Sequence, residues 1–327
     1  MEKKQPKVSV IMPSLNMKKY ITQSIESVIN QTLTDIEILC IDAGSDDGTL
    51  EILKKYAEED ERVHVFLSNK KSYGAQVNQG LNNAKGEYVS IIETDDYIQE
   101  NMLESLYNLT QIGYIDIVKG NFYHVYDNVE NIIKADTAKR SLANLDKAFK
   151  INNQPIFLEG HPSIWSAIYK RSFLLNNEIM FLEEEGGAWV DNPFFYETAL
   201  KAQTIRYTDT PYYYYRESNE NSSTNNLTNL SIPAKRIKDI FEVLKDNEWD
   251  NPEIKILFYN RIFRYIEIII ENQEKSGEEL DYEATKDVHE ILRNVDITYV
   301  QENLSTKNKR IYYKFASPLI LAKFENN

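Results

Sequence analysis

The sequence predicts an α/β fold in which a mostly parallel sheet is flanked by helices, with an all-helical appendage at the C-terminal end. Four apolar runs alternate with helical patterns before residue 100, and such alternation is typical of right-handed βαβ units. After residue 233, apolar residues recur at helical spacing. We therefore expect a domain over residues 1–225 and a helical region over residues 226–327.

The elements of the first half follow one another as strand, loop and helix. Each apolar run is short and is followed by turn-forming residues, after which apolar side chains recur three or four positions apart. Beyond residue 109 the pattern is looser, and the strands there are predicted from shorter runs. We expect strands over residues 7–12, 36–41, 63–67, 88–92, 115–118, 121–126, 161–170 and 207–215, and helices that begin near residues 20, 50, 73 and 100.

The most informative stretch is residues 88–97, where an apolar run ends in Glu93, Asp95 and Asp96. Its polar and apolar residues do not alternate, which predicts a strand covered on both faces, and function in such sheets lies beyond the carboxyl ends of the strands. Crowded carboxylates repel one another, and an oxygen-preferring cation, Mg²⁺ or Mn²⁺, relieves that repulsion while leaving positions for substrate phosphates. The alternative is a solvated acidic turn in which Asp95 or Asp96 caps the next helix.

Three other loops carry polar residues that could bind a ligand. After the second strand, Asp42 and Ser45 are placed to hydrogen-bond sugar hydroxyls or a base, although Asp, Gly and Ser also form ordinary turns. Asp191 precedes a predicted helix. It could be a functional carboxylate, or it could simply be the N-cap of that helix, with Pro193 in the first turn. Arg216 begins a polar stretch that could close over a bound phosphate or form a surface connection.

The composition of the chain limits which classes of partner it can bind and indicates its cellular compartment. The chain has 327 residues, 42% of them apolar, and a formal charge of -14, which argues against a nucleic-acid partner because no basic stripe is present. Cys40 is the single cysteine, which excludes a disulfide framework and favours a reducing, cytoplasmic setting. No apolar run approaches the roughly 20 residues that a membrane-spanning helix needs.

The helical C-terminal region carries no predicted catalytic group. It could dimerise the chain, dock on a membrane or brace the first domain. Residues 307–324 are basic and aromatic in an otherwise acidic chain. This segment is a candidate for peripheral contact with anionic lipid, and ordinary helix packing is the alternative.

Five stretches in order along residues 7–110 resemble a known family. They are VSVIMPSLN (residues 8–16), SIESVINQT (24–32), DAGSDDGT (42–49), GLNNAKGEY (80–88) and ETDD (93–96). In this order and spacing they resemble the inverting nucleotide-sugar glycosyltransferases of family 2, which have the GT-A fold, and weaker similarity extends to about residue 220. The resemblance implies a Rossmann-like GT-A domain with a nucleotide-sugar half over residues 1–110 and an acceptor half over residues 111–225.

The resemblance also implies roles for single residues. Asp95 contacts the ribose or the metal, Asp96 is the best metal ligand, and Asp191 falls where the family keeps its catalytic base. Glu93 stands where many relatives have Asp, so the expected metal ligands are Asp96 and Asp95. Ala43 follows Asp42 where many relatives have a second Asp, so the base of the nucleotide is not predicted from this loop. The residues implied to border the nucleotide are Pro13, Ser14, Asp42 and Ser45.

Together these observations predict an inverting, metal-dependent sugar transferase with a UDP-sugar as the expected donor. The acceptor would be a hydroxyl of a cell-surface polysaccharide, or of a lipid-linked or protein-linked glycan, at the inner face of the membrane. The alternative is a non-catalytic subunit of a glycan-assembly complex that binds a nucleotide sugar. A nucleotidyltransferase is disfavoured because residues 13–16 lack a glycine-rich loop with a basic residue.

Overall fold

The computed structural model describes residues 5–127, 133–134, 147–218, 231–245, 250–276, 280 and 282–325. The chain divides into two compact units, Met1–Glu220 and Asn221–Asn327. The predicted boundary at residue 225 lies outside the described residues.

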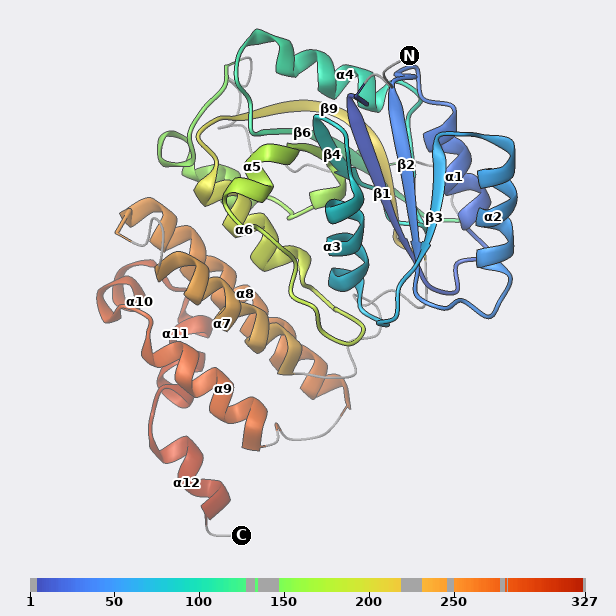
Figure 1. Ribbon diagram of the computed structural model, residues 1–327. Coiled ribbons are helices and arrows are strands. Elements are labelled where there is room, and N and C mark those ends of the chain that lie inside the picture. Colours follow the sequence, from blue (N-terminus) through green and yellow to red (C-terminus); the bar gives the residue numbers. More distant parts are fainter. Residues whose placement is uncertain are drawn as a thin grey trace. The chain divides into compact units, whose positions relative to one another are not determined.

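The first unit is built on one sheet with the strand order β3-β2-β1-β4-β8-β6-β9-β5, and β7 pairs with β6 (Figure 1). The strands β3, β2, β1 and β4 are parallel to one another, as the alternating pattern predicts. Strand β8 runs antiparallel to both β4 and β6. The sheet is therefore parallel in its first half and mixed in its second. The strands are β1 (Val8–Ser14), β2 (Ile36–Asp42), β3 (Val63–Leu67), β4 (Tyr88–Ile91), β5 (Tyr97–Ile98), β6 (Ile117–Val125), β7 (Ile133–Lys134), β8 (Ala167–Lys170) and β9 (Ile205–Arg216).

Helices cover this sheet on both faces, which explains why every residue of β1, β2 and β4 is buried. Helix α3 packs on β1 and β2 (Figure 1), and Gly80 permits the close approach, because a Cβ there would lie 2.4 Å from Ile11 Cγ2. Helix α1 contacts α2 and β5. The helices are α1 (Ile21–Ile29), α2 (Thr49–Glu59), α3 (Tyr73–Asn83), α4 (Met102–Asn108), α5 (Arg171–Asn176) and α6 (Asp191–Lys201), with short 3₁₀ turns at Leu109–Ile112, Ile151–Asn153, Pro155–Glu159 and Ile164–Ser166.

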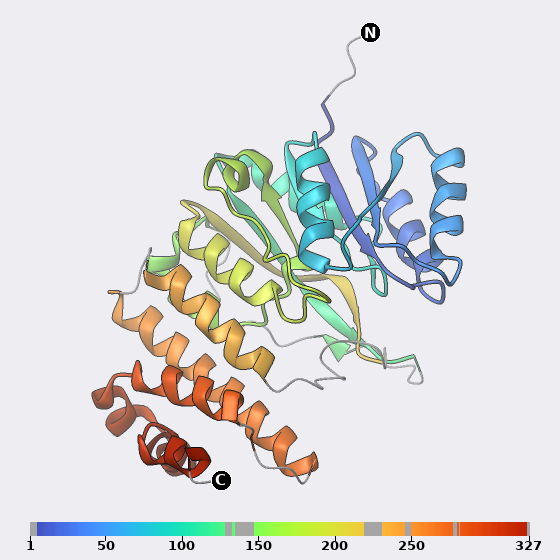
Figure 2. The same ribbon diagram turned by 60° about the horizontal axis from the view of Figure 1, so that its bottom comes forward.

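The described part of the second unit is helical throughout, as the periodicity predicts. Helix α7 packs against α8 and α9, and α11 and α12 also pack against α9 (Figure 2). None of the described helices combines the length and the apolar character needed to cross a membrane. The helices are α7 (Ser231–Lys245), α8 (Pro252–Ser276), α9 (Tyr282–Arg293), α10 (Ile297–Asn303), α11 (Thr306–Phe315) and α12 (Leu319–Glu325).

Candidate functional site

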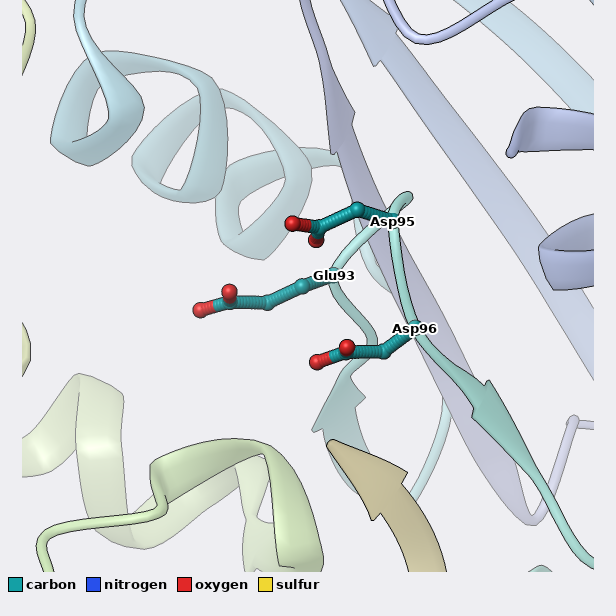
Figure 3. A group of neighbouring side chains, drawn as sticks. All are labelled: Glu93, Asp95 and Asp96. Atoms are coloured by element: carbon teal, nitrogen blue, oxygen red, sulfur yellow. The ribbon is translucent and has the colours of Figure 1, made fainter. Parts of the chain in front are cut away.

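Three acidic residues meet in the loop between β4 and β5. Glu93, Asp95 and Asp96 each offer a carboxylate oxygen, and these oxygens lie within 4.8 Å of one another. Figure 3 shows the three side chains projecting to the same side of the loop. Asp96 is buried, whereas Glu93 and Asp95 are half-buried. The loop thus presents a set of hard oxygen donors, which Mg²⁺ and Mn²⁺ prefer.

Burial and mutual repulsion disfavour three negative charges in this loop. Burial, with the nearby charges of Asp95 and Asp191, raises the pKa of Glu93 to about 8. Burial and the charges of Asp95 and Glu93 hold the pKa of Asp96 well above its usual range. Bound protons or a bound cation would relieve the repulsion between these carboxylates. Their arrangement therefore fits a divalent metal ion.

Strand β9 holds Asp96 in place from the other half of the sheet. Tyr213 Oη donates to Asp96 Oδ2 (2.8 Å), and the backbone N–H of Arg216 donates to Asp96 Oδ1 (2.7 Å). The backbone N–H of Glu93 donates to the same Tyr213 hydroxyl (3.2 Å). Because a carboxylate offers about four lone-pair positions, Asp96 keeps further capacity to bind a cation.

Arg216 has protein partners on three of its guanidinium nitrogens. Nε donates to the carbonyl oxygen of Asp95 (2.8 Å), Nη2 donates to Gln23 Oε1 (2.7 Å), and Nη1 is paired with Asp127. The side chain is 7% exposed. Arg216 thus braces the acidic loop, and its contact with a phosphate stays a prediction.

A second polar group lies at the carboxyl ends of β1 and β2, where Ser14 is aligned with Asp42 in the sheet. Ser45 Oγ donates to Asp42 Oδ2 (2.6 Å), and Ser14 Oγ donates to the same oxygen (3.2 Å). Pro13 connects this group to the acidic loop, because its carbonyl accepts a hydrogen bond from Thr94 Oγ1 (2.9 Å). The four residues predicted to border the nucleotide thus lie at the same sheet edge as the acidic loop.

Gln76, which the sequence pattern does not single out, links α3 to this edge of the sheet. Its Nε2 donates to the carbonyl oxygens of Ser14 (2.8 Å) and Ile41 (2.6 Å), and the side chain is buried. Its position one helical turn after Ser72, the N-cap of α3, marks the start of the helix but does not reveal these partners.

Asp191 begins α6, and Val190 rather than Asp191 stands at the capping position. Its charge contributes to the raised pKa of Glu93, so the two carboxylates lie within electrostatic reach of each other. Tyr73, the first residue of α3, also belongs to this group: its hydroxyl donates to Glu93 Oε1 (3.3 Å), and burial with the charges of Glu93 and Asp191 raises its pKa. The sequence gives no signal for this role of Tyr73.

The segment that leads to Asp191 is fastened to α3. The side-chain amide of Asn78 pairs with the backbone of Phe181, accepting from its N–H and donating to its carbonyl oxygen (both 2.9 Å). Gly186 N–H donates to the carbonyl oxygen of Lys71 (2.9 Å). Gly74 allows the chains to touch, because a Cβ there would lie 2.0 Å from the carbonyl oxygen of Leu182. Helix α3 therefore positions both Tyr73 and the approach to Asp191.

Comparisons with known proteins agree with this architecture. The family model described as "Glycosyl transferase family 2" matches residues 9–175. Glycosyltransferase GlyG of Streptococcus pneumoniae serotype 4 is 40% identical over 121 residues, which are 37% of this chain and 40% of that protein. The chain thus matches less than half the length of this relative.

Two solved structures share the fold. TarS residues 1–349 of S. aureus, in complex with UDP-GlcNAc, superposes with a TM-score of 0.77 at 20% identity and covers 98% of this chain and 92% of that chain. The mannosyltransferase PcManGT of Pyrobaculum calidifontis, in complex with GDP-Man and Mn²⁺, superposes with a TM-score of 0.55 at 13% identity and covers 96% and 80%. At these identities the likeness establishes the GT-A-like fold of the chain.

We expect Tyr213→Phe to weaken Mn²⁺ binding about 10–100-fold, because a buried Asp96 oxygen loses the hydroxyl that orients it. Calorimetric titration with MnCl₂ measures the change. Tyr212→Phe is the matched control, since the neighbouring side chain points to the opposite face of β9. Equal Mn²⁺ affinity in the two variants would show that the Tyr213 hydroxyl does not support a metal ligand.

We expect Gly74→Ala to lower the free energy of unfolding by about 1–3 kcal/mol, because the new methyl group collides with the Leu182 carbonyl. Alanine is the better helix former, so helix propensity alone predicts the opposite sign. Urea denaturation gives the difference. Asn82→Ala, at an exposed position of the same helix, should stay within about 0.5 kcal/mol of the parent.

Proposed function

The chain belongs to glycosyl transferase family 2, and we propose that it is an inverting, metal-dependent glycosyltransferase that moves a sugar from a nucleotide sugar to a hydroxyl of a glycan. The observation that carries this proposal is the acidic loop of Glu93, Asp95 and Asp96 with Asp191 in electrostatic reach. The acidic loop would bind the metal ion that stabilises the leaving diphosphate. Asp191 would accept the proton of the attacking hydroxyl. Inversion requires these two functions to act from opposite faces of the sugar.

The donor is a UDP-sugar in this proposal. The UDP-GlcNAc complex of the similarly folded TarS supports this choice. Ser14 and Ser45 are hydrogen-bonded to Asp42 beside the acidic loop, where the nucleoside would lie. Asp42 is fully buried and accepts hydrogen bonds from the backbone N–H groups of Gly44 and Ser45 (both 2.9 Å), so protein contacts alone orient its carboxylate.

Asp96 and Asp95 would hold Mg²⁺ or Mn²⁺, with Glu93 within reach of the same ion. When bound, the ion would stabilise the negative charge that develops on the leaving diphosphate. Tyr213 and the Arg216 backbone fix the orientation of the Asp96 carboxylate.

Asp191 is the general base of the proposed reaction. It accepts the proton of the acceptor hydroxyl while the acceptor oxygen bonds to the anomeric carbon and the bond from that carbon to the diphosphate oxygen breaks. Attack opposite the leaving group inverts the anomeric centre in a single displacement. Retention through a covalent intermediate would instead need a carboxylate nucleophile close to the anomeric carbon.

We also propose that the enzyme works at the inner face of the membrane on a cell-surface polysaccharide, or on a lipid-linked or protein-linked glycan. Cys40 is buried in β2, where desolvation raises the pKa of its thiol to about 12. A thiol so protected is inert, so Cys40 acts as a core residue and not as a nucleophile.

A screen of nucleotide sugars tests the donor and the metal together. We expect release of UDP from one UDP-sugar on addition of MnCl₂, and loss of that release with excess EDTA. GDP- and dTDP-sugars serve as matched substrates and should release little nucleotide. Binding of UDP and Mn²⁺ without turnover of any donor would identify a non-catalytic subunit instead, and turnover unaffected by EDTA would exclude the metal.

The Asp191→Asn variant tests the base, because an amide cannot take the proton. We expect kcat to fall about 10²–10⁴-fold while UDP still binds. Glu185→Gln is the control, since Glu185 is exposed in the same segment and should keep full activity. Parent-like kcat in Asp191→Asn would show that Asp191 is not the general base.

NMR of the product tests inversion separately. A product that keeps the anomeric configuration of the donor would contradict an inverting mechanism.

A further inference from the structure

The basic residues of the second unit gather near its C-terminal end. The whole chain has a formal charge of -14, yet residues 303–324 contain no Asp or Glu. The same stretch contains Lys307, Lys309, Arg310, Lys314 and Lys323. An acidic protein is repelled by an anionic surface unless a local excess of positive charge faces that surface.

Helix α11 presents this charge on one face. Lys307, Arg310 and Lys314 are exposed and follow one another at intervals of three and four residues, which aligns them along the helix. Tyr313 lies beside them and is 55% exposed. Leu319, at the start of α12, is 77% exposed, more than any other large apolar side chain among the described residues.

The opposite face of α11 is fixed to the rest of the unit. Phe315 is 4% exposed, and its carbonyl oxygen is 2.7 Å from His289 Nδ1 of α9. Ser305 caps the helix by accepting from the N–H of Asn308 (3.1 Å). The exposed face is therefore held outward by packing and by the helix cap.

Lys307 is partly neutralised within the unit. Its Nζ lies 3.8 Å from Glu267 Oε1 and 3.7 Å from Glu271 Oε1 of α8. The other two exposed cations of α11 are Arg310 and Lys314. These two residues, with Tyr313 and Leu319, form what we call the C-terminal patch.

We propose that the C-terminal patch docks the protein on an anionic lipid bilayer. Arg310 and Lys314 complement lipid phosphates, while Tyr313 and Leu319 suit the boundary between headgroups and acyl chains. A soluble polyanion would neutralise the cations but would leave both apolar side chains in water. A second copy of the patch would bring like charges together, so a symmetric dimer through it is disfavoured.

The patch uses no residue of the proposed catalytic site, so the lipid contact and the transfer reaction can fail independently. A bilayer contact would keep the enzyme beside an acceptor carried on a lipid. Because the patch offers two exposed cations and two exposed apolar side chains, the attachment is reversible and sensitive to salt.

Co-sedimentation of the full-length protein with vesicles tests the proposal. We expect binding to vesicles of phosphatidylcholine containing about one third phosphatidylglycerol, release at about 0.5 M NaCl, and little binding to pure phosphatidylcholine. Absence of binding to the anionic vesicles, or equal binding to both kinds, would overturn it.

Two variants assign the contact to the patch. We expect Arg310→Glu/Lys314→Glu and Leu319→Ser each to reduce vesicle partitioning at least about 10-fold, because charge attraction and apolar insertion both contribute. The matched controls are Lys54→Glu/Lys55→Glu on α2, which changes the net charge equally, and Ile112→Ser, where the side chain is 74% exposed.

The controls should bind as the parent does, and thermal melting should give the same midpoint for all four variants. If Lys54→Glu/Lys55→Glu lost as much vesicle binding as Arg310→Glu/Lys314→Glu, the effect would come from net charge alone. That result would reject the patch as the site of contact. A dimer seen by light scattering that is lost in Leu319→Ser, with no vesicle binding by the parent, would show that the surface joins copies of the chain and would also reject the lipid contact.

Discussion

Three carboxylates are crowded together in the loop after β4, and their mutual repulsion is the main electrostatic constraint on the candidate site. Burying Asp96 beside Glu93 and Asp95 is unfavourable, as the raised pKa values of Glu93 and Asp96 indicate. Two hydrogen bonds from β9 offset part of this cost at Asp96. The remaining imbalance is what makes the loop able to bind a cation, because an ion can replace the protons that the carboxylates would otherwise retain.

Strands from both halves of the sheet meet at the acidic loop. The parallel half ends its strands at one edge, where Pro13, Asp42 and the acidic loop meet. Strand β9 pairs with β5 and directs Tyr213 at Asp96, and Trp165 stacks on the Tyr213 ring at 4.1 Å.

Much of the fold and part of the site are predictable from the sequence. The strands β1, β2 and β4 are recognised because burial on both faces makes them continuous apolar runs, and the acids after β4 stand out beside them. Contacts between residues far apart leave no local pattern. Tyr213 lies 117 positions from Asp96, and Tyr73 lies 20 positions from Glu93, so neither pairing could be inferred. Arg216 was recognised as a donor, but its protein partners could not be inferred.

Helix α3 contacts both the acidic loop and the segment that leads to Asp191. Tyr73 contacts Glu93 of the acidic loop, while Gly74 and Asn78, on the same helix, seat the segment that carries Asp191. A shift of this helix would therefore displace the base and alter the surroundings of Glu93 together. Helix α3 thus contacts both the loop that would serve the donor and the segment that leads to the carboxylate that would serve the acceptor, while β9 holds Asp96.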